Sequence, residues 1–425
     1  MRTNELISKI KNNELDEKLA DIYVDEALIV SQKERYIKAV EKFVSLYGDS
    51  DVEVYSTPGR SEVCGNHTDH QHGEVLAAAI NLDIIAVVSK NDSVVKILSD
   101  DYDIQAIDIT DLEKKDLEVE TSEGLIRGVL ARYKELGYKI GGFNAYMTSN
   151  VLQGSGLSSS AAFEVMIGTV LSGLYNDMSI DPVTIAKVGQ YSENVYFGKP
   201  CGLMDQCACS VGSLIHIDFK DPSTPVVEKI NVDFSEFEHS LCIVDVHASH
   251  ADLTNDYASI PYEMKKVAKF FDQEFLRDVS EEEFYKHLPE VRKAVNDRAV
   301  LRTIHLFEEN KRVRRIVEAL NHRDFKTFKE VIKLSGESSY KYLQNIYSNN
   351  DVDNQAVSIA IALSEDIIKD HGVVRVHGGG FAGTIQVFVK DDFVDEYKQE
   401  IEKYFGEGSC HVLKIRKYGG MKVID

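Results

Sequence analysis

The spacing of hydrophobic positions changes along the chain, and each change predicts a different kind of element. Residues 1–46 carry apolar positions at helical spacing among many Glu and Lys residues, which predicts helix. From residue 52 to about residue 99 the apolar residues come in β-branched runs, such as Ile84-Ile85-Ala86-Val87-Val88, interrupted by Gly, Asn and Asp. These runs predict strands. The first hundred residues therefore combine a helical segment with a sheet.

The remainder of the chain continues in blocks of helix and strand. Helices are predicted at 125–136, 161–175, 262–345, 355–369 and 392–404, and strands at 145–151, 213–219, 239–246, 384–389 and 411–415. Because strict βαβ alternation is missing, the pattern is typical of an α+β fold. A shift in composition near residues 225–240 predicts a boundary between two domains, 1–234 and 235–425.

Composition and charge exclude several classes of protein. The 425 residues are 43% hydrophobic and 28% charged, which is usual for a globular chain with a core. The formal net charge of −22 argues against a nucleic-acid partner, because polyanions are held by clustered Lys and Arg. Six scattered cysteines and the lack of a signal-peptide core or of 18 consecutive apolar residues predict a cytoplasmic protein with reduced thiols and no membrane partner.

A glycine- and serine-rich segment lies between a predicted strand and a predicted helix. Its residues are Gly154-Ser155-Gly156-Leu157-Ser158-Ser159-Ser160-Ala161-Ala162. Glycines let a backbone approach a ligand, and successive N–H groups at a helix N-terminus favour phosphate. The segment is no Walker A loop, because G-x-x-x-x-G-K-[ST] is missing. It predicts a phosphate site, and the alternative is a flexible loop that ends in a serine N-cap.

A second segment, residues 58–73, is dense in polar residues and predicts a binding loop between strands. In one interpretation it binds metal, since His67, Asp69, His70 and His72 resemble part of the H-x-H-x-D-H run of metallo-hydrolases, although that run is incomplete. In another, its short Asn, Asp and His side chains exchange hydrogen bonds with the hydroxyls of a polyol. A solvated hairpin loop is the third possibility.

Two further segments carry weaker signals. In Cys201-Gly202-Leu203-Met204-Asp205-Gln206, the apolar neighbours of Asp205 predict a raised pKa and a role as base, although a lone Asp in a turn is more often a cap. In His377-Gly378-Gly379-Gly380-Phe381-Ala382-Gly383-Thr384, the glycines permit close packing against a ligand or another loop. A plain turn between two strands would need fewer glycines.

Together the four segments, in this order, resemble the galactokinase family of the GHMP kinase superfamily. Residues 58–69 resemble P-G-R-x-N-L-I-G-E-H-T-D, residues 154–161 resemble G-x-G-L-S-S-S-A, residues 201–206 resemble C-G-I-M-D-Q, and residues 378–383 resemble G-G-G-F-G-G. The resemblance extends from about residue 43 to residue 417. It implies a two-domain GHMP kinase fold: an N-terminal, ribosomal-S5-like domain (1–234) with the first three segments, and a C-terminal, ferredoxin-like domain (235–425) with the last.

The resemblance also implies an activity and the residues that perform it. The reaction would be the ATP-dependent phosphorylation of the C1 hydroxyl of galactose, with Mg²⁺ and with ATP as co-substrate. Asp205 matches the catalytic base, Arg60 the arginine that stabilises the transferring phosphoryl group, and Ser160 and Glu193 the Mg²⁺ ligands. The matched sugar-binding residues are Asn66, His67, Asp69, Gly202 and Tyr257, and the matched ATP-binding residues are Gly154, Ser155, Gly156, Leu157, Ser158, Ser159 and Ser160.

Several positions depart from the family pattern, and three of them lie in the sugar signature. Asn66 stands in place of a Glu that contacts the far end of the hexose, Glu62 in place of Asn, and His70 in place of Tyr. Since Asn66 would not repel a 6-carboxylate, we expect galacturonate to be tolerated better than in a Glu-bearing relative. A kinase for a modified galactose is therefore one alternative, and a non-catalytic galactokinase-like regulator is another. The intact serines 158–160 favour an enzyme.

Overall fold

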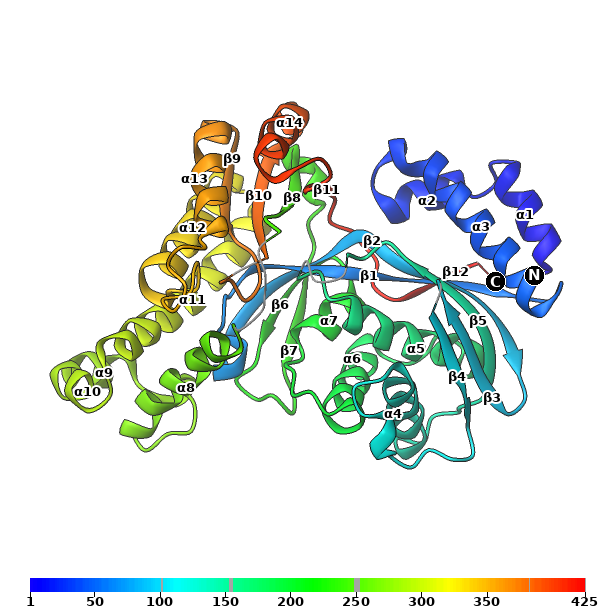
Figure 1. The fold of residues 1–425 in the computed structure, drawn as a ribbon, viewed down its shortest axis with the longest axis horizontal. Coiled ribbons are helices and arrows are strands. Elements are labelled where there is room, and N and C mark those ends of the chain that lie inside the picture. The colour runs from blue at the N-terminus through cyan, green and yellow to red at the C-terminus, as the bar shows by residue number, and fades with distance from the viewer. Residues whose placement is uncertain (101, 153–155, 248–252, 382, 425) are drawn as a thin grey trace.

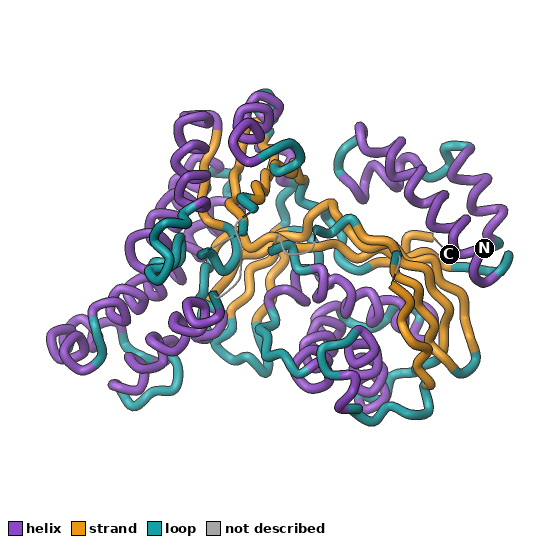
Figure 2. The backbone as a smooth tube through the Cα atoms, viewed as in Figure 1, coloured by secondary structure: helices purple, strands orange, loops and turns teal. Residues whose placement is uncertain are grey.

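The computed structural model describes residues 1–100, 102–152, 156–247, 253–381 and 383–424, and its strands form two sheets (Figure 1). The larger sheet has eight strands in the order β12-β1-β2-β5-β3-β4, with β6 paired to β2 and β7 paired to β6. The smaller sheet has four strands in the order β11-β8-β10-β9. Helices and strands come in blocks, and the α+β prediction is confirmed (Figure 2).

The larger sheet is built around two long strands. Its members are β1 (Glu53–Cys64), β2 (Glu74–Asn91), β3 (Val94–Ser99), β4 (Tyr102–Asp108), β5 (Gly142–Ser149), β6 (Leu214–Asp218), β7 (Val226–Ile230) and β12 (Met421–Ile424). The 18 residues of β2 pair with β6 along its first part and with β5 along its second. The short β12 pairs with β1, so the C-terminal strand returns to the N-terminal sheet.

Helices cover both faces of this sheet. On one face lie α1 (Thr3–Lys11), α2 (Asp16–Tyr23) and α3 (Ile29–Tyr47), and on the other lie α4 (Ser122–Glu135), α5 (Ser159–Asn176), α6 (Pro182–Tyr191) and α7 (Met204–Val211), as Figure 1 shows. Successive side chains of a strand point to opposite faces. Accordingly, Ile85 and Val87 pack with the first group of helices, whereas Ala86 and Val88 belong to the core under the second.

The smaller sheet and most of the remaining helices form the C-terminal half. Its strands are β8 (His239–Asp245), β9 (Gly372–Val376), β10 (Thr384–Lys390) and β11 (Cys410–Leu413). The helices are α8 (Thr254–Phe270), α9 (Glu281–Lys286), α10 (Leu288–Ala294), α11 (Asp297–Asn321), α12 (Phe325–Ser338), α13 (Ala356–Ile368) and α14 (Val394–Phe405). In the described part of the chain, no helix combines the length and the apolar character needed to cross a bilayer.

The segment predicted as a binding loop is partly a strand. Residues up to Cys64 belong to β1, whose pairing with β2 shifts register near Gly59 and again near Val63. A Cβ on Gly59 would lie 2.8 Å from the carbonyl oxygen of Leu157. Glycine therefore lets the serine-rich segment pack directly on the strand, and the residues from Gly65 to Gly73 form the connecting turn.

The strands change from the larger to the smaller sheet between β7 and β8, inside the region where composition shifts. However, β12 returns to the larger sheet. One hydrophobic cluster also joins residues of both sheets, for example Ala78 and Phe388. The division at residue 234 therefore stays a prediction.

Candidate active site

Arg60 and Asp205 form the centre of the candidate site. Arg60 lies on β1, and Asp205 lies in the first turn of α7. The Nε and Nη2 groups of Arg60 donate to Asp205 Oδ1 at 2.7 Å and Oδ2 at 2.8 Å, a two-pronged geometry that is both strong and directional. Nη1 of Arg60 donates to the carbonyl oxygen of Gly156. One guanidinium thus joins three of the four sequence motifs.

Asp205 is ionised at neutral pH in this arrangement. Burial raises the pKa of Asp205, but the charge and hydrogen bonds of Arg60 outweigh it, and the Ser158 hydroxyl donates to Oδ2 at 2.5 Å. The pKa of Asp205 therefore lies below its ordinary value, and the prediction of a raised pKa is wrong, because the paired cation outweighs the apolar neighbours. The Asp205 side chain keeps 33% of its surface accessible, so a ligand can reach it.

The serine-rich segment contacts this pair. Gly154 and Ser155 lie outside the described residues. Leu157 is fully buried, and its carbonyl oxygen accepts a hydrogen bond from the Arg60 amide at 3.1 Å. Ser158 occupies the N-cap of α5 with a φ of 57°, yet its hydroxyl bonds Asp205 and caps no amide of the helix. Ser159 is half-buried and Ser160 is exposed. Because no side chain caps the first N–H groups of α5, these groups are free to bind a phosphate.

A buried acidic cluster lies beside the pair. Glu193 belongs to a π-helical turn, Ser192–Phe197, and Glu164 belongs to α5. Nε2 of Gln206 donates to Glu164 Oε2 and to Glu193 Oε2, both at 3.0 Å. Burial and then the charge of Glu193 raise the pKa of Glu164 well above its usual range.

This cluster fits a hard cation. Oε1 of Glu164 has no hydrogen-bond partner, and the cation paired with Glu193, Lys199, is 4.0 Å away. Carboxylate and hydroxyl oxygens are the donors that Mg²⁺ prefers. Glu164 was not singled out from the sequence, although its position one helical turn after Ser160 places both on the same face of α5.

Asp69 and Gly202, two of the predicted sugar-binding residues, lie next to each other in the structure. A Cβ on Gly202 would lie 2.7 Å from Asp69 Oδ2, so the close approach requires glycine. Burial and then the negative charge of Glu62 raise the pKa of Asp69 to about 6. No side chain in the described ranges donates a hydrogen bond to the Asp69 carboxylate, which leaves acceptor positions for a ligand.

Three predicted sugar-binding side chains contact the glycine-rich motif. They donate to three consecutive carbonyl oxygens: Asn66 Nδ2 to Gly378 at 2.6 Å, His67 Nε2 to Gly379 at 2.9 Å, and the Tyr257 hydroxyl to Gly380 at 2.8 Å. A Cβ on Gly379 would lie 2.6 Å from Cε1 of Tyr257. Gly379 therefore lets Tyr257 pack closely on the motif, whereas Gly378 and Gly380 adopt φ values of 63° and 80° that favour glycine. Because three of its carbonyl oxygens accept side-chain hydrogen bonds, the motif is more than a turn between β9 and β10.

Asn66 has no hydrogen-bonding position left for a ligand. Besides Gly378, its Nδ2 donates to Glu62 Oε1 at 3.1 Å, and its Oδ1 accepts from Asn345 at 2.7 Å and from Ser339 at 3.3 Å. The residue is fully buried, and its two donors and two acceptor positions are all used. Asn66 therefore has no free donor for a sugar carboxylate, and the expectation that galacturonate is tolerated has no support at this residue.

The histidines of the signature do not assemble a metal site. His67 Nδ1 contacts His70 Nε2 at 3.3 Å, and His72 stacks on Phe275 with ring centroids 3.6 Å apart. Within the described ranges, no three side chains of the metal-ligating types His, Cys, Asp and Glu group together. The metal interpretation of His67, Asp69, His70 and His72 is therefore not supported.

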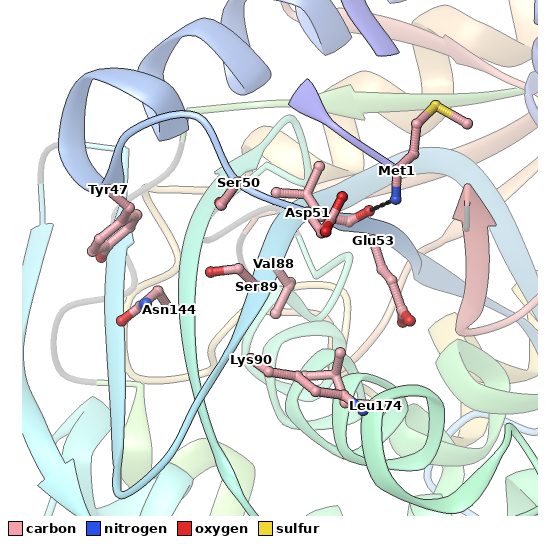
Figure 3. Close-up of a pocket in the computed structure, with 11 residues that line it drawn as sticks. Met1, Tyr47, Ser50, Asp51, Glu53, Val88, Ser89, Lys90, Asn144 and Leu174 are labelled. Carbon is pink, nitrogen blue, oxygen red and sulfur yellow. Dashed lines mark hydrogen bonds between the residues drawn. The ribbon is translucent and has the colours of Figure 1, made fainter. Parts of the chain in front are cut away.

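A hollow of about 510 Å³ elsewhere in the molecule shares no residue with the four motifs (Figure 3). It is lined by the segment before β1, by the end of β2 and by single residues of β5 and α5, among them Tyr47, Lys90, Asn144 and Leu174. The pairing of Arg60 with Asp205, and not this hollow, therefore locates the candidate site.

Comparison with known proteins identifies the family of this chain. Residues 41–90 match the family model of the galactokinase galactose-binding signature, and residues 124–213 match that of the GHMP kinases N terminal domain. A galactokinase of Actinobacillus pleuropneumoniae serotype 3 (strain JL03) is 31% identical over 370 residues, which cover 85% of this chain and 92% of that protein. The chain belongs to the galactokinase family. The galactokinase of Glaesserella parasuis serovar 5 (strain SH0165) is 30% identical over 367 residues, covering 86% and 92%.

Solved structures confirm the predicted GHMP kinase fold of this galactokinase-family chain. Lactococcus lactis galactokinase complexed with galactose superposes with a TM-score of 0.75 at 24% identity, covering 90% of this chain and 98% of that chain. Methanococcus jannaschii mevalonate kinase superposes with a TM-score of 0.61 at 14% identity, covering 86% and 99%. The family predicted from the motifs is confirmed.

Proposed function

We propose that this chain transfers the γ-phosphoryl group of ATP to the C1 hydroxyl of galactose, which yields galactose 1-phosphate and ADP. The observation that carries the proposal is the two-pronged pair of Arg60 and Asp205, which Ser158 joins at the start of α5. Phosphoryl transfer needs an oriented hydroxyl and charge stabilisation, and this pair offers an anionic acceptor beside a cation. The curated relatives named galactokinase support galactose as the sugar.

Asp205 would accept the proton of the C1 hydroxyl, and Arg60 would stabilise the transferring phosphoryl group. While both prongs of Arg60 bond Asp205, the carboxylate is a weak base, because its pKa is low. Phosphate oxygens of ATP compete for the same guanidinium. When Arg60 turns toward them, Asp205 loses its main stabilising charge, its pKa rises, and it becomes a better base in the complex that reacts.

Mg²⁺ would be held by the Glu193 carboxylate and the Ser160 hydroxyl, with the Glu164 carboxyl group as their neighbour. When bound, Mg²⁺ neutralises the charge of the β- and γ-phosphates. Gln206 hydrogen-bonds Glu193 and follows Asp205 directly on α7, so it fixes the spacing between the metal-binding carboxylate and the base.

The sugar would be held by Asp69, Gly202 and Tyr257, with Asn66 and His67 fixing the glycine-rich motif around it. Carboxylate oxygens suit the hydroxyl groups of a neutral sugar, which donate hydrogen bonds. We also propose that the protein works in the cytoplasm with the sugar and ATP as its partners, and without a nucleic acid or a membrane.

A coupled ADP-release assay over a panel of hexoses and sugar acids tests the proposal, with the product identified by phosphorus NMR. We expect ADP release with galactose, formation of galactose 1-phosphate, and the loss of both in Asp205→Asn. ADP release with galactose at the rate of the sugar-free control would contradict the proposed function.

A further inference from the structure

Glu62 lies on the same face of β1 as the catalytic arginine. Arg60, Ser61 and Glu62 pair in unbroken register with Ala79, Ala78 and Ala77 of β2. Side chains two residues apart on a strand point to the same face, so Glu62 follows Arg60 toward the candidate site, whereas Ser61 bonds His377 on the other side. The position of Glu62 is thus fixed by the strand that carries the reacting pair.

Only one of the two carboxylate oxygens of Glu62 accepts hydrogen bonds from described residues. Oε1 accepts from Asn66 Nδ2 at 3.1 Å and from Arg375 Nη2 at 3.1 Å. No described residue donates to Oε2, while 7% of the side chain stays accessible. In contrast, the amide of Asn66 is saturated by protein atoms and the residue is fully buried. Of these two residues, Glu62 is the one that retains an acceptor for a ligand.

The charges around this acceptor do not balance. Arg60 is committed to Asp205, and Arg375 is committed to Glu62. Asp69 forms no ion pair in the part of the chain that the structure describes, and burial, followed by the negative charges of Glu62 and Asp205, raises its pKa. Three carboxyl groups, those of Glu62, Asp69 and Asp205, therefore share two arginines that are already paired, and burial raises the pKa of Glu62 as well.

We propose that Glu62 is a specificity-determining residue, which with Asp69 accepts hydrogen bonds from the hydroxyls of a neutral sugar and rejects sugars that carry a carboxylate. The inference rests on the proposed function, since it takes this region to be the sugar site. Two like charges about 4 Å apart at an effective dielectric constant near 20 weaken binding by roughly a thousandfold. The neutral hydroxymethyl group of galactose avoids this repulsion, so galacturonate is the probe that separates the two outcomes.

The test compares galactose with galacturonate in the wild-type enzyme, Glu62→Gln and Glu74→Gln. Glu74 is the matched control, because it is buried like Glu62 and paired with arginine, in its case with Arg277 and Arg314. It belongs to β2 and to no sequence motif assigned to the sugar. For each enzyme, kcat/KM is measured for both sugars, and the Kd of galactose is measured by calorimetry.

For wild type we expect kcat/KM for galactose to exceed that for galacturonate by at least about a hundredfold. Glu62→Gln should shrink this ratio at least about tenfold and raise the Kd of galactose, while Glu74→Gln leaves the ratio unchanged. A ratio in Glu62→Gln within threefold of wild type overturns the inference.

The wild-type ratio keeps the test decisive if Glu62→Gln does not fold. A wild-type enzyme that uses galacturonate within tenfold of galactose overturns the role of Glu62, although the enzyme is then still a sugar kinase. A wild-type enzyme that phosphorylates neither sugar overturns the proposed function instead, so the two failures are distinguishable.

Discussion

Two aspartates of the larger sheet region are paired with arginine, and they differ in how completely they are satisfied. Asp83, on β2, accepts from Arg35 at 2.5 Å, from Tyr23 at 2.8 Å and from Arg416 at 3.2 Å, and it is fully buried. Asp205 accepts from one arginine and one serine and remains one-third accessible. In both, burial raises the pKa and the arginine charges outweigh it, so each carboxylate is ionised.

The difference separates a pair that is closed to ligands from the pair that we propose to act in the reaction. Asp83 joins α2, α3 and the segment before β12 to the sheet, and no part of it is left for a ligand. Asp205 joins the strand with Arg60 to the serine-rich segment and keeps accessible surface. Ionisation and an arginine partner are therefore common to both, and the unused hydrogen-bonding capacity is what marks the site.

Asp83→Asn should lower the free energy of unfolding by about 3–5 kcal/mol, because it leaves the buried Arg416 and the half-buried Arg35 without their shared anion. Activity per folded molecule should stay at the wild-type level. Denaturant titration and kinetics below the unfolding transition measure the two quantities. A loss of kcat in the folded variant would show that Asp83 also serves the reaction.

Arg60→Met should show the opposite behaviour, with kcat reduced about 10²–10³-fold, as for the loss of one preorganised donor at developing charge. We expect its melting temperature to change by only a few degrees, since Asp205 stays hydrated. Arg35→Met serves as control and should keep kcat while losing stability. If Arg60→Met retains more than a tenth of wild-type kcat, Arg60 does not stabilise the phosphoryl group.

Asp69→Asn should stabilise the fold at pH 7 by about 1–3 kcal/mol and weaken galactose binding. The pKa of Asp69 is raised to about 6, so the folded state binds its proton more tightly than the unfolded state does. This contribution to stability is present at low pH and is lost as the pH rises from about 4 through 6. Thermal denaturation from pH 4 to 8 should show a smaller loss of stability in the variant. If the stability of wild type and variant changed in parallel with pH, the pKa of Asp69 would not be raised in the folded state.

Glu193→Gln should raise the Mg²⁺ concentration needed for half-maximal activity at least about tenfold, since Mg²⁺ prefers an anionic oxygen to an amide. The Kd of galactose is the internal control and should stay unchanged. Binding of Mn²⁺ to the enzyme–ATP complex, followed by electron paramagnetic resonance, checks the affinity independently of turnover. An unchanged Mn²⁺ affinity would leave Glu193 as a residue of the π-helical turn alone.

The sequence predicted the contact between Arg60 and Asp205 better than the surroundings of Asn66. Motif similarity singled out Arg60 and Asp205, and β1 and α7 bring them into direct contact. It could not predict that Asn66 is saturated, because two of its partners, Ser339 and Asn345, follow it by 273 and 279 residues. The charge state of Asp205 was misjudged for the same reason, since local apolar neighbours are visible in a sequence and an arginine 145 residues away is not.

The fold shows the same division. Strong periodicity predicted α5 and α13 closely, but the polar residues of β1 hid a strand, because polar side chains that face a binding site interrupt the hydrophobic pattern. The return of β12 to the first sheet had no signal in its four residues.

We propose that Asp205 is the general base of a galactose 1-kinase, and single-turnover kinetics measures the step that it would catalyse. Excess enzyme is mixed with limiting ATP and saturating galactose, quenched at intervals, and assayed for galactose 1-phosphate, in wild type and in Asp205→Asn. The predicted result is complete conversion by wild type and a single-turnover rate about 10²–10⁴-fold lower in the variant, with an unchanged Kd for galactose. Conversion by Asp205→Asn at more than a tenth of the wild-type rate would contradict the account.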